Sequence, residues 1–380
     1  MRILLTTDVV GGVWRYTVTL VRELVDRGHT CAVAVLGDPD DQRLCELPAS
    51  VHVTSRELKL EWMQDPWADL EAGTAWLVEE ARRWRPDVIH FNQFAYALGE
   101  FHAPTLIVAH SDVRSWFVDV REQEAPPQWD RYTDLVRRAL GAADAVVAPT
   151  AYQSGRLAQH YGRTAARVIH NGIRAAPTPA DETPTSKRSM ILVAGRAWDE
   201  AKGVAVLEEA LADLGAEAPS VHVVGPLDGP NGESIRVERL VAHGEVDGGA
   251  MHRFYANSRI YVGPSLYEPF GLSPLEAAAQ GCALLLSSIG SFRELWHDAA
   301  RFFEPARPRV LGVRLTEMLE APHRIDELGR KARERARSRY TADRMSDQYE
   351  ALYRELTGRG REAERAARPT VHADRLESSD

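Results

Sequence analysis

Cysteine is scarce in this chain of 380 residues, which contains three of them. Cys31, Cys45 and Cys282 form an odd and widely spaced set without a Cys-x-x-Cys pair. A disulfide framework needs an even set, and a cysteine zinc site needs closely spaced pairs. The sequence therefore indicates neither kind of stabilisation, and a reducing cytoplasm is the compartment that fits best.

Long apolar runs and an excess of positive charge are also missing. No stretch approaches the roughly 18 consecutive apolar residues that span a bilayer, and the apolar run after Met1 is too short for a secretion signal. The formal net charge of -9 disfavours non-specific binding to nucleic acid. We therefore expect a soluble, cytoplasmic protein with no nucleic-acid partner and no stable membrane insertion, in which particular residues hold any anionic ligand.

Short apolar segments alternate with helical patterns along most of the chain. The expected strands lie at residues 2–6, 30–37, 50–55, 87–91, 105–110, 144–150 and 167–172, and then at 190–195, 220–225, 239–244, 259–263 and 282–288. Strands that alternate with helices favour a parallel sheet covered on both faces. Because the pattern occurs twice, we predict an α/β protein with two Rossmann-like domains.

The boundaries of these domains follow from changes in composition. We expect an N-terminal domain over residues 1–172 and a linker over 173–189, where Pro, Thr and charged residues replace the apolar pattern. A second domain is expected over 190–340. A helix at 341–358 is expected to pack back on the first domain, and the charged segment 359–380 is predicted to be a disordered tail.

The segment "YEPFGLSPLE" places two glutamates, Glu268 and Glu276, around the expected start of a helix that follows a strand. Ligands of open α/β sheets bind at the carboxyl ends of strands, and a helix N-terminus favours a phosphate. A carboxylate is a suitable partner for the adjacent hydroxyls of a sugar or ribose. Alternatively, Ser273, Pro274 and Glu276 fit a capping box in which Glu276 bonds only the backbone of Ser273.

"EPFGLSPLE" also resembles the E-x7-E signature of the retaining GT-B glycosyltransferases of family four. Four further segments resemble motifs of that family and occur in its order: "GGVWRY", "VAHSD", "VIHNGI" and "AGRAWDEAKG". The resemblance covers about residues 2 to 357. It implies the GT-B fold, in which two Rossmann-like domains with parallel sheets face an interdomain cleft, and a nucleotide sugar bound mostly to the C-terminal domain.

On the donor side, the resemblance assigns Glu268 to hydroxyls of the transferred sugar and Glu276 to the ribose diol. The backbone amides of Phe270, Gly271 and Leu272 are implied to lie near the same donor. These assignments outweigh the capping box as the main role of Glu276, although the two oxygens of one carboxylate can share both roles.

Arg196 and Lys202 match the pair of the family that binds the diphosphate. Two fixed cations stabilise the negative charge that grows on the departing diphosphate, so neither a metal ion nor a cofactor is implied. From the residues alone, both could be solvated charges on a loop. Gly11 and Gly12 imply close approach of the chain to the diphosphate, and they do not complete the G-x-G-x-x-G pattern of dinucleotide-binding proteins.

His110 ends an expected strand and corresponds to the active-site histidine of the family. Its expected role is to position the donor sugar, and a satisfied core histidine is the alternative. Asp112 is predicted either to orient His110 or to contact the acceptor. Asn171 with Gly172 is implied to line the cleft, although a simple turn also explains this pair.

Tryptophans give the weakest signal for an acceptor site. Trp14, Trp62, Trp67 and Trp116 are expected near loops of the N-terminal domain, and flat aromatic rings pack well on the apolar faces of sugars or cyclitols. Trp14 and Trp116 are predicted to contact the acceptor because each follows a loop assigned to the cleft. The alternative is that they belong to the core.

The resemblance thus implies a retaining, metal-independent transfer of a hexose-type sugar from a nucleoside-diphosphate sugar, expected to be UDP-linked, to a soluble small-molecule acceptor. Two alternatives stay open: a nucleotide-sugar epimerase on the same scaffold and a non-catalytic protein that binds sugar nucleotides. An acidic surface turn explains "DPDD" at residues 38–41 without a metal. No motif indicates the acceptor or the oligomeric state.

Overall fold

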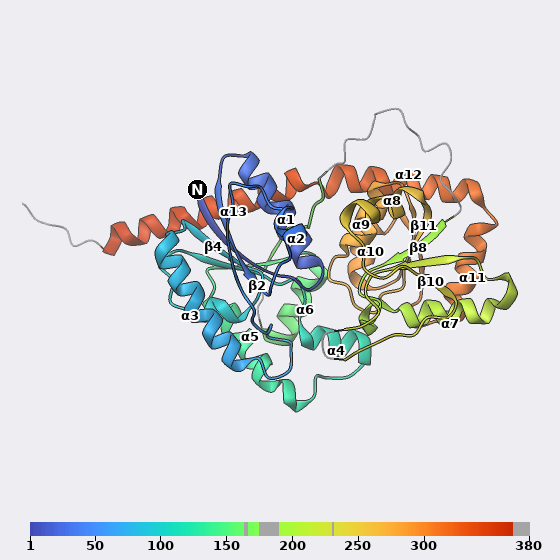
Figure 1. The fold of residues 1–380 in the computed structure, drawn as a ribbon, viewed down its shortest axis with the longest axis horizontal. Coiled ribbons are helices and arrows are strands. Elements are labelled where there is room, and N and C mark those ends of the chain that lie inside the picture. The colour runs from blue at the N-terminus through green and yellow to red at the C-terminus, as the bar shows by residue number, and fades with distance from the viewer. Residues whose placement is uncertain (163–165, 175–189, 230–231, 368–380) are drawn as a thin grey trace, which may run out of the picture.

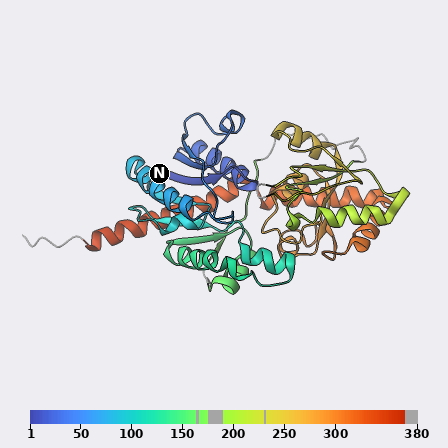
Figure 2. The same ribbon diagram turned by 60° about the horizontal axis from the view of Figure 1, so that its bottom comes forward.

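A computed structural model describes residues 1–162, 166–174, 190–229 and 232–367, with side chains up to residue 358. The chain forms two lobes, each built on its own sheet, and Figures 1 and 2 show them side by side. All strand pairings within the two sheets are parallel. The predicted class, two Rossmann-like domains with parallel sheets, is confirmed.

The N-terminal sheet has seven strands in the order β3-β2-β1-β4-β5-β6-β7. They are β1 (Arg2–Asp8), β2 (Thr30–Leu36), β3 (His52–Arg56), β4 (Val88–Phe91), β5 (Thr105–Val108), β6 (Ala145–Ala148) and β7 (Arg167–Val168). The helices around it are α1 (Gly12–Asp26), α2 (Asp41–Leu44), α3 (Trp67–Trp84), α4 (Val113–Arg121), α5 (Asp130–Ala142) and α6 (Ala151–Tyr161), with 3-10 turns η1 (Ala95–Leu98) and η2 (Pro127–Trp129).

The C-terminal sheet has six strands in the order β10-β9-β8-β11-β12-β13. They are β8 (Met190–Ala194), β9 (Val221–Val224), β10 (Leu240–Ala242), β11 (Ser258–Gly263), β12 (Ala283–Ser287) and β13 (Ala300–Phe303). The helices are α7 (Val204–Leu214), α8 (Gly248–Asn257), α9 (Leu272–Ala279), α10 (Gly290–Trp296), α11 (Pro308–Leu319) and α12 (Pro322–Arg339), with η3 (Glu200–Lys202) and η4 (Gly215–Glu217).

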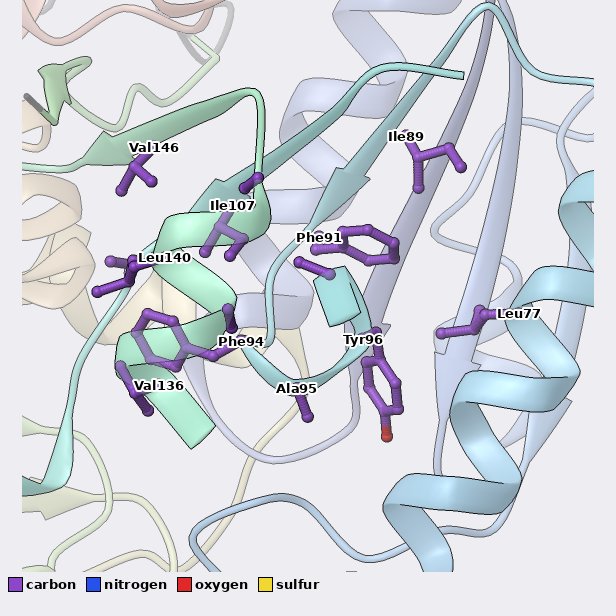
Figure 3. Packing of buried hydrophobic residues seen from close by; sticks show 14 of the residues in the cluster. Leu77, Ile89, Phe91, Phe94, Ala95, Tyr96, Ile107, Val136, Leu140 and Val146 are labelled. Carbon is purple, nitrogen blue, oxygen red and sulfur yellow. The ribbon is translucent and has the colours of Figure 1, made fainter. Parts of the chain in front are cut away.

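Each sheet is buried on both faces, which explains its nearly continuous apolar strands. In β1, Ile3 and Leu5 pack into one core cluster and Leu4 packs into another on the opposite face, as expected for side chains that alternate along a strand. Figure 3 shows part of the second cluster, where Phe94 lies against Val136 of α5. The two cores hold the carboxyl ends of the strands rigidly.

The last helix, α13 (Ala342–Ala367), packs on the N-terminal domain although it follows the C-terminal one (Figure 1). Tyr349 and Tyr353 are fully buried in the same cluster as Ile3 and Leu5. The guanidinium of Arg27 at the end of α1 binds the Asp347 carboxylate at 2.6 Å. The helix therefore ties the two lobes together.

The C-terminal segment is more helical than the sequence predicts. The expected tail at 359–380 is wrong over residues 359–367, because α13 continues to Ala367. The Ala, Arg and Glu residues of this stretch are good helix formers that can extend an anchored helix. Residues 368–380 and most of the expected linker, 175–189, lie outside the described residues. No helix in the described ranges is both long and apolar enough to cross a membrane.

Candidate active site

A cleft of about 1130 Å³ lies between the two domains. Its walls are loops that follow the carboxyl ends of β1, β4 and β5 in the N-terminal domain and of β8, β9 and β11 in the C-terminal domain. This is the edge at which open α/β sheets bind their ligands. All the residues predicted for the site except Trp14 line this cleft: Gly11, Gly12, His110, Asp112, Trp116, Asn171, Arg196, Lys202, Glu268, Phe270, Gly271, Leu272 and Glu276.

Lys202 and Glu268 form an ion pair inside the cleft. Lys202 ends η3 after β8, Glu268 follows β11, and the ammonium donates to the Oε2 atom of the carboxylate. The two side chains are only 22% and 15% exposed, so water screens their attraction less than that of a surface pair. Two loops of the C-terminal sheet thus meet at one point, where a positive and a negative group are held together.

Arg196 forms a second pair, with its Nη2 atom 2.8 Å from Oδ2 of Asp199. Burial alone would raise the pKa of Asp199, but the nearby charges of Arg196 and Lys202 hold this pKa below its usual value. Gly11 of the N-terminal domain lies directly against the arginine. A Cβ atom at Gly11 would sit 2.3 Å from Nη1 of Arg196, and the φ angle there is +87°. Glycine is therefore required where the first domain approaches the cation.

Glu276 does not cap its helix, so the capping-box alternative is wrong. Helix α9 begins at Leu272 after Gly271, whose φ of +91° starts the helix without a side-chain cap. Glu276 lies one turn further on, and its Oε1 atom is 3.4 Å from Nη1 of Arg15 on α1. Burial raises the pKa of Glu276, and the charge of Arg15 and a hydrogen bond with Tyr255 oppose this rise. The carboxylate is thus available to the cleft.

His110 lies just beyond β5, and Asn92 orients it. The Nδ2 atom of Asn92 donates to the Thr6 carbonyl at 2.6 Å and to the Thr17 hydroxyl at 3.1 Å, which turns the amide oxygen toward the imidazole. That oxygen lies 2.8 Å from Nε2 of His110, so Nε2 carries the proton. Burial lowers the pKa of His110 to about 3. The ring is therefore neutral at physiological pH.

Asp112 lines the cleft, but both roles predicted for it are wrong. It is the N-cap of α4 and accepts hydrogen bonds from the amide and hydroxyl of Ser115, from Gln153 and from Tyr161. These four donors fill the acceptor positions of its two oxygens, so it is not free for an acceptor molecule. Asn92, not Asp112, orients His110.

The two tryptophans predicted for the acceptor differ. Trp14 is 5% exposed in the core cluster behind β1, and its indole Nε1 donates to Glu46 at 2.7 Å, so the prediction of acceptor contact is wrong for this residue. Its neighbours Val13, Arg15 and Tyr16 on α1 line the cleft, whereas Trp14 points into the core. Trp116 does line the cleft, where it packs against Tyr267 and Val120.

Asn171, next to Gly172, is 5% exposed, and its Oδ1 atom has no hydrogen-bond partner within the described part of the chain. An unpaired buried acceptor is costly unless a ligand or water meets it. Because Asn171 lies in the cleft wall, this unpaired oxygen is consistent with ligand contact. A simple turn would explain the Asn-Gly pair but not the unpaired oxygen.

Several residues of the cleft were not predicted from the sequence. Arg15 belongs to the segment "GGVWRY" that carries part of the resemblance, and Asn92 directly follows a strand predicted from the apolar pattern, so these two signals could have found them. Asp199 and Tyr255 were also not predicted, and they bond to the predicted residues Arg196 and Glu276, respectively. Asp8 and Glu61, both buried carboxylates of the N-terminal domain, also line the cleft.

Comparison with known families supports this architecture over most of the chain. Residues 10–176 match the model of Glycosyltransferase Family 4, and residues 188–320 match that of Glycosyl transferases group 1. Glycogen synthase of Mycobacterium tuberculosis is 27% identical over 376 residues, with 87% of each chain covered. D-inositol 3-phosphate glycosyltransferase of Geodermatophilus obscurus is 26% identical, with 76% of this chain and 72% of that protein covered.

Solved structures show the same fold. Sucrose-phosphate synthase of Thermosynechococcus elongatus superposes with a TM-score of 0.76 at 20% identity, covering 94% of this chain and 100% of that chain. HepE of Anabaena, solved in complex with UDP-glucose, gives a TM-score of 0.71 at 19% identity, covering 93% and 99%. With two consecutive family models matched and the fold shared, the chain is a glycosyltransferase that uses nucleotide-sugar donors and belongs to glycosyltransferase family 4, a retaining family with the GT-B fold.

Proposed function

We propose that this protein transfers a hexose from a UDP-linked sugar to a soluble small-molecule acceptor, with retention of configuration and without a metal ion. The observation that carries the proposal is the meeting of Lys202 with Glu268, beside Arg196, in one interdomain cleft. A nucleotide sugar has an anionic diphosphate next to a neutral, hydroxyl-rich ring. Cations and a hydroxyl-binding carboxylate at adjacent positions match both of these parts.

The two cations act on the leaving group. As the acceptor oxygen bonds to the anomeric carbon, the bond from that carbon to the phosphate oxygen breaks and its electron pair leaves on the diphosphate, while the acceptor hydroxyl proton is released. Arg196 and Lys202 stabilise this growing charge more than they stabilise the intact donor, because they are fixed before the reaction. The positive charge needed there is thus supplied by the chain itself.

The acids and His110 hold the donor sugar and nucleoside. Glu268 accepts hydrogen bonds from sugar hydroxyls, and Glu276 accepts them from the ribose, next to Arg15. Neutral His110, with its proton on Nε2 facing Asn92, offers Nδ1 only as an acceptor. An imidazole with a pKa of about 3 is a weak base at neutral pH, so His110 positions the donor sugar and does not deprotonate the acceptor.

The relatives support the choice of donor. The Anabaena protein that shares this fold was solved with UDP-glucose, and glycogen synthase and D-inositol 3-phosphate glycosyltransferase cover most of the chain. All of them are consistent with hexose transfer from a nucleotide sugar.

The test is release of the nucleoside diphosphate from a panel of UDP-, GDP- and ADP-hexoses, with and without mixtures of soluble acceptors. We expect release from UDP-hexose that depends on the acceptor, and a product whose anomeric configuration by NMR matches that of the donor. Interconversion of donor sugars without an acceptor would instead indicate an epimerase. Binding without any turnover would indicate a non-catalytic protein.

Dependence on metal is tested separately in the same assay. We expect turnover to be unchanged by EDTA, because fixed side chains supply the positive charge at the diphosphate. Loss of activity in EDTA that manganese or magnesium restores would contradict this part of the proposal.

A further inference from the structure

The N-terminal wall of the cleft contains a pocket of aromatic and acidic side chains. We call it the acceptor pocket and define it by Asp8, Glu61, Trp62, Phe94, Trp129 and Tyr132, all of which line the cleft. Trp129 and Tyr132 meet edge to face with ring centroids 5.7 Å apart. Phe94 packs on α5, as Figure 3 shows. Rigid aromatic surfaces of this kind suit the apolar C–H faces of sugars and cyclitols.

Glu61 is fixed in this pocket by the backbone. Its side chain is buried, and its two oxygens accept hydrogen bonds from the amides of Phe94 at 2.9 Å and Ala95 at 3.0 Å. Each oxygen has a second acceptor position, because a carboxylate oxygen can accept two hydrogen bonds. Glu61 is therefore held in place with capacity left for ligand hydroxyls.

Asp8 is held in a similar way at the end of β1. Its Oδ1 atom accepts from the Val10 amide at 2.9 Å, and its Oδ2 atom accepts from Gln93 at 3.0 Å. Gln93 is itself fixed, since its own oxygen accepts from the Thr6 hydroxyl at 2.7 Å. The pocket thus presents two buried carboxylates whose positions are set by hydrogen bonds from uncharged groups.

The basic residues of the cleft are already paired with other acids. Among the described residues, the lysines and arginines that line the cleft are Arg15, Arg121, Arg196 and Lys202. They bind Glu276, Glu200, Asp199 and Glu268 respectively, all on the C-terminal domain. Within that part of the chain, neither Asp8 nor Glu61 has an ion-pair partner within 4 Å. The cations that line the cleft are thus each paired with an acid of the C-terminal domain, while the charges of Arg196 and Arg43 act on Asp8 only from beyond ion-pair distance and oppose the rise in its pKa that burial causes.

One donor in the pocket is also unused. The indole Nε1 of Trp129 is buried and has no hydrogen-bond partner in the described ranges. A buried N–H without a partner is costly, and a hydroxyl oxygen of a bound ligand would satisfy it. The pocket thus offers one donor and two acceptors around an aromatic surface.

We propose that the acceptor pocket binds an uncharged, hydroxyl-rich acceptor, a sugar, glycoside or cyclitol without a phosphate group, through Glu61, Asp8 and Trp129. This inference rests on the proposed function, since it names the second substrate of the same cleft. Hydroxyls donate to the two carboxylates and accept from the indole. A phosphate at the same place would meet two fixed carboxylates with no free cation, so the pocket disfavours phosphorylated acceptors.

The test compares matched acceptors that differ only in a phosphate: glucose with glucose 6-phosphate, maltose with maltose 1-phosphate, and myo-inositol with its monophosphates. With the donor selected by the release assay, we expect the neutral member of the pair that reacts to have a kcat/KM at least tenfold above that of its phosphate. A higher kcat/KM for the phosphorylated member would overturn the inference.

Variants of the pocket sharpen this test. We expect Glu61→Gln to raise KM for the neutral acceptor at least fivefold and to lower the discrimination against the phosphate by a similar factor. Trp129→Phe keeps an aromatic ring but removes the indole N–H, and it is expected to raise the same KM about threefold. Glu57→Gln, an exposed carboxylate in the same loop, is the matched control and is expected to change neither quantity. Unchanged acceptor KM and discrimination in both pocket variants would contradict the proposal.

Failure of this inference can be told apart from failure of the proposed function. Donor binding is measured alone, by the rise in melting temperature with a UDP-hexose. If the donor binds and is turned over only with phosphorylated acceptors, the inference on the acceptor pocket is wrong and the proposed function stands. If no nucleotide sugar binds or reacts, the proposed function itself is wrong.

Discussion

The two walls of the cleft differ in how they treat charge. On the C-terminal wall, Lys202 and Arg196 are each joined to a carboxylate, which places cations and acids side by side. On the N-terminal wall, Glu61 and Asp8 are buried without a cation within ion-pair distance in the described chain, next to aromatic rings. The first arrangement suits a diphosphate joined to a sugar, and the second suits a neutral polyol. We call the C-terminal side of the cleft, with Lys202, Arg196 and their carboxylate partners, the ionic wall. We call the N-terminal side, with Glu61 and Asp8, the hydroxyl-binding wall, after its proposed role.

The largest effects are expected on the ionic wall. We predict that Glu268→Ala, Arg196→Ala and Lys202→Ala each lower kcat/KM at least about tenfold, which corresponds to roughly 1.4 kcal/mol of transition-state stabilisation. The reason is that, in the proposed mechanism, these groups contact the sugar or the leaving diphosphate. Initial-rate kinetics with saturating acceptor measure the change.

Lys331→Ala is the control for this set, because Lys331 is an exposed lysine that pairs with Glu327 along α12, away from the cleft. It should leave kcat/KM unchanged. Wild-type kinetics in all three cleft variants would contradict a role for Glu268, Arg196 and Lys202 in binding the donor.

A smaller effect is expected at the nucleoside end of the same wall. Glu276→Gln removes the negative charge that pairs with Arg15 and, in the proposed binding mode, weakens hydrogen bonds to ribose hydroxyls. We expect KM for the donor to rise about fivefold, equivalent to roughly 1 kcal/mol, with kcat within a factor of two. A fall in kcat with no change in donor KM would place Glu276 at the reacting sugar instead.

The hydroxyl-binding wall can be tested by stability, without any substrate. Burial raises the pKa of Glu61 from 4.5 to about 7, and the charge of Asp8 adds to this rise. Because the folded-state pKa is the higher one, the stabilisation from protonated Glu61 is complete below about pH 4.5 and is lost as the pH rises through about 7.

Glu61→Gln cannot ionise, so its melting temperature should fall less than that of the wild type between pH 5.5 and pH 8. We expect the fall in melting temperature between these two pH values to be larger for the wild type than for the variant by at least about 2 °C, or roughly 1 kcal/mol for a domain of this size. Differential scanning fluorimetry at both pH values measures this. Identical pH dependence of the two proteins would show that Glu61 ionises normally.

The smallest functional effect is expected at Trp14, which the sequence placed in the cleft and the structure places in the core. Trp14→Phe removes the hydrogen bond to Glu46, so we expect a loss of about 1 kcal/mol in unfolding free energy. The kcat/KM should stay within a factor of two. A large rise in acceptor KM would return this residue to the acceptor site.

The sequence predicted the fold and the ionic wall better than the hydroxyl-binding wall, for a physical reason. Parallel strands buried on both faces leave continuous apolar runs, so most strands could be found. Helix α10 and strand β13 were missed, because the short "RFF" strand and the seven-residue helix before it carry little periodic signal. Glu268 and Glu276 stand in one local segment with a recognisable spacing.

The acceptor pocket has no such local pattern. Glu61 belongs to the loop before α3, while the amides that fix it follow β4, so only the folded chain brings them together. Asp112 shows the opposite error. Its position near His110 in the sequence suggested a role in the site. In the folded chain, its carboxylate accepts hydrogen bonds from Ser115 of α4 and from two residues of α6, Gln153 and Tyr161, that are distant in sequence.

The most direct test of the central claim is a thermal-shift panel of nucleotide sugars on the wild type and on Arg196→Ala and Glu276→Gln. A ligand that binds only the folded protein raises its melting temperature according to its concentration and Kd. We predict that a UDP-hexose raises the melting temperature of the wild type, and that the same concentration gives a clearly smaller shift in each variant. Equal shifts in all three proteins, or no shift with any nucleotide sugar, would contradict a donor held between these cations and acids.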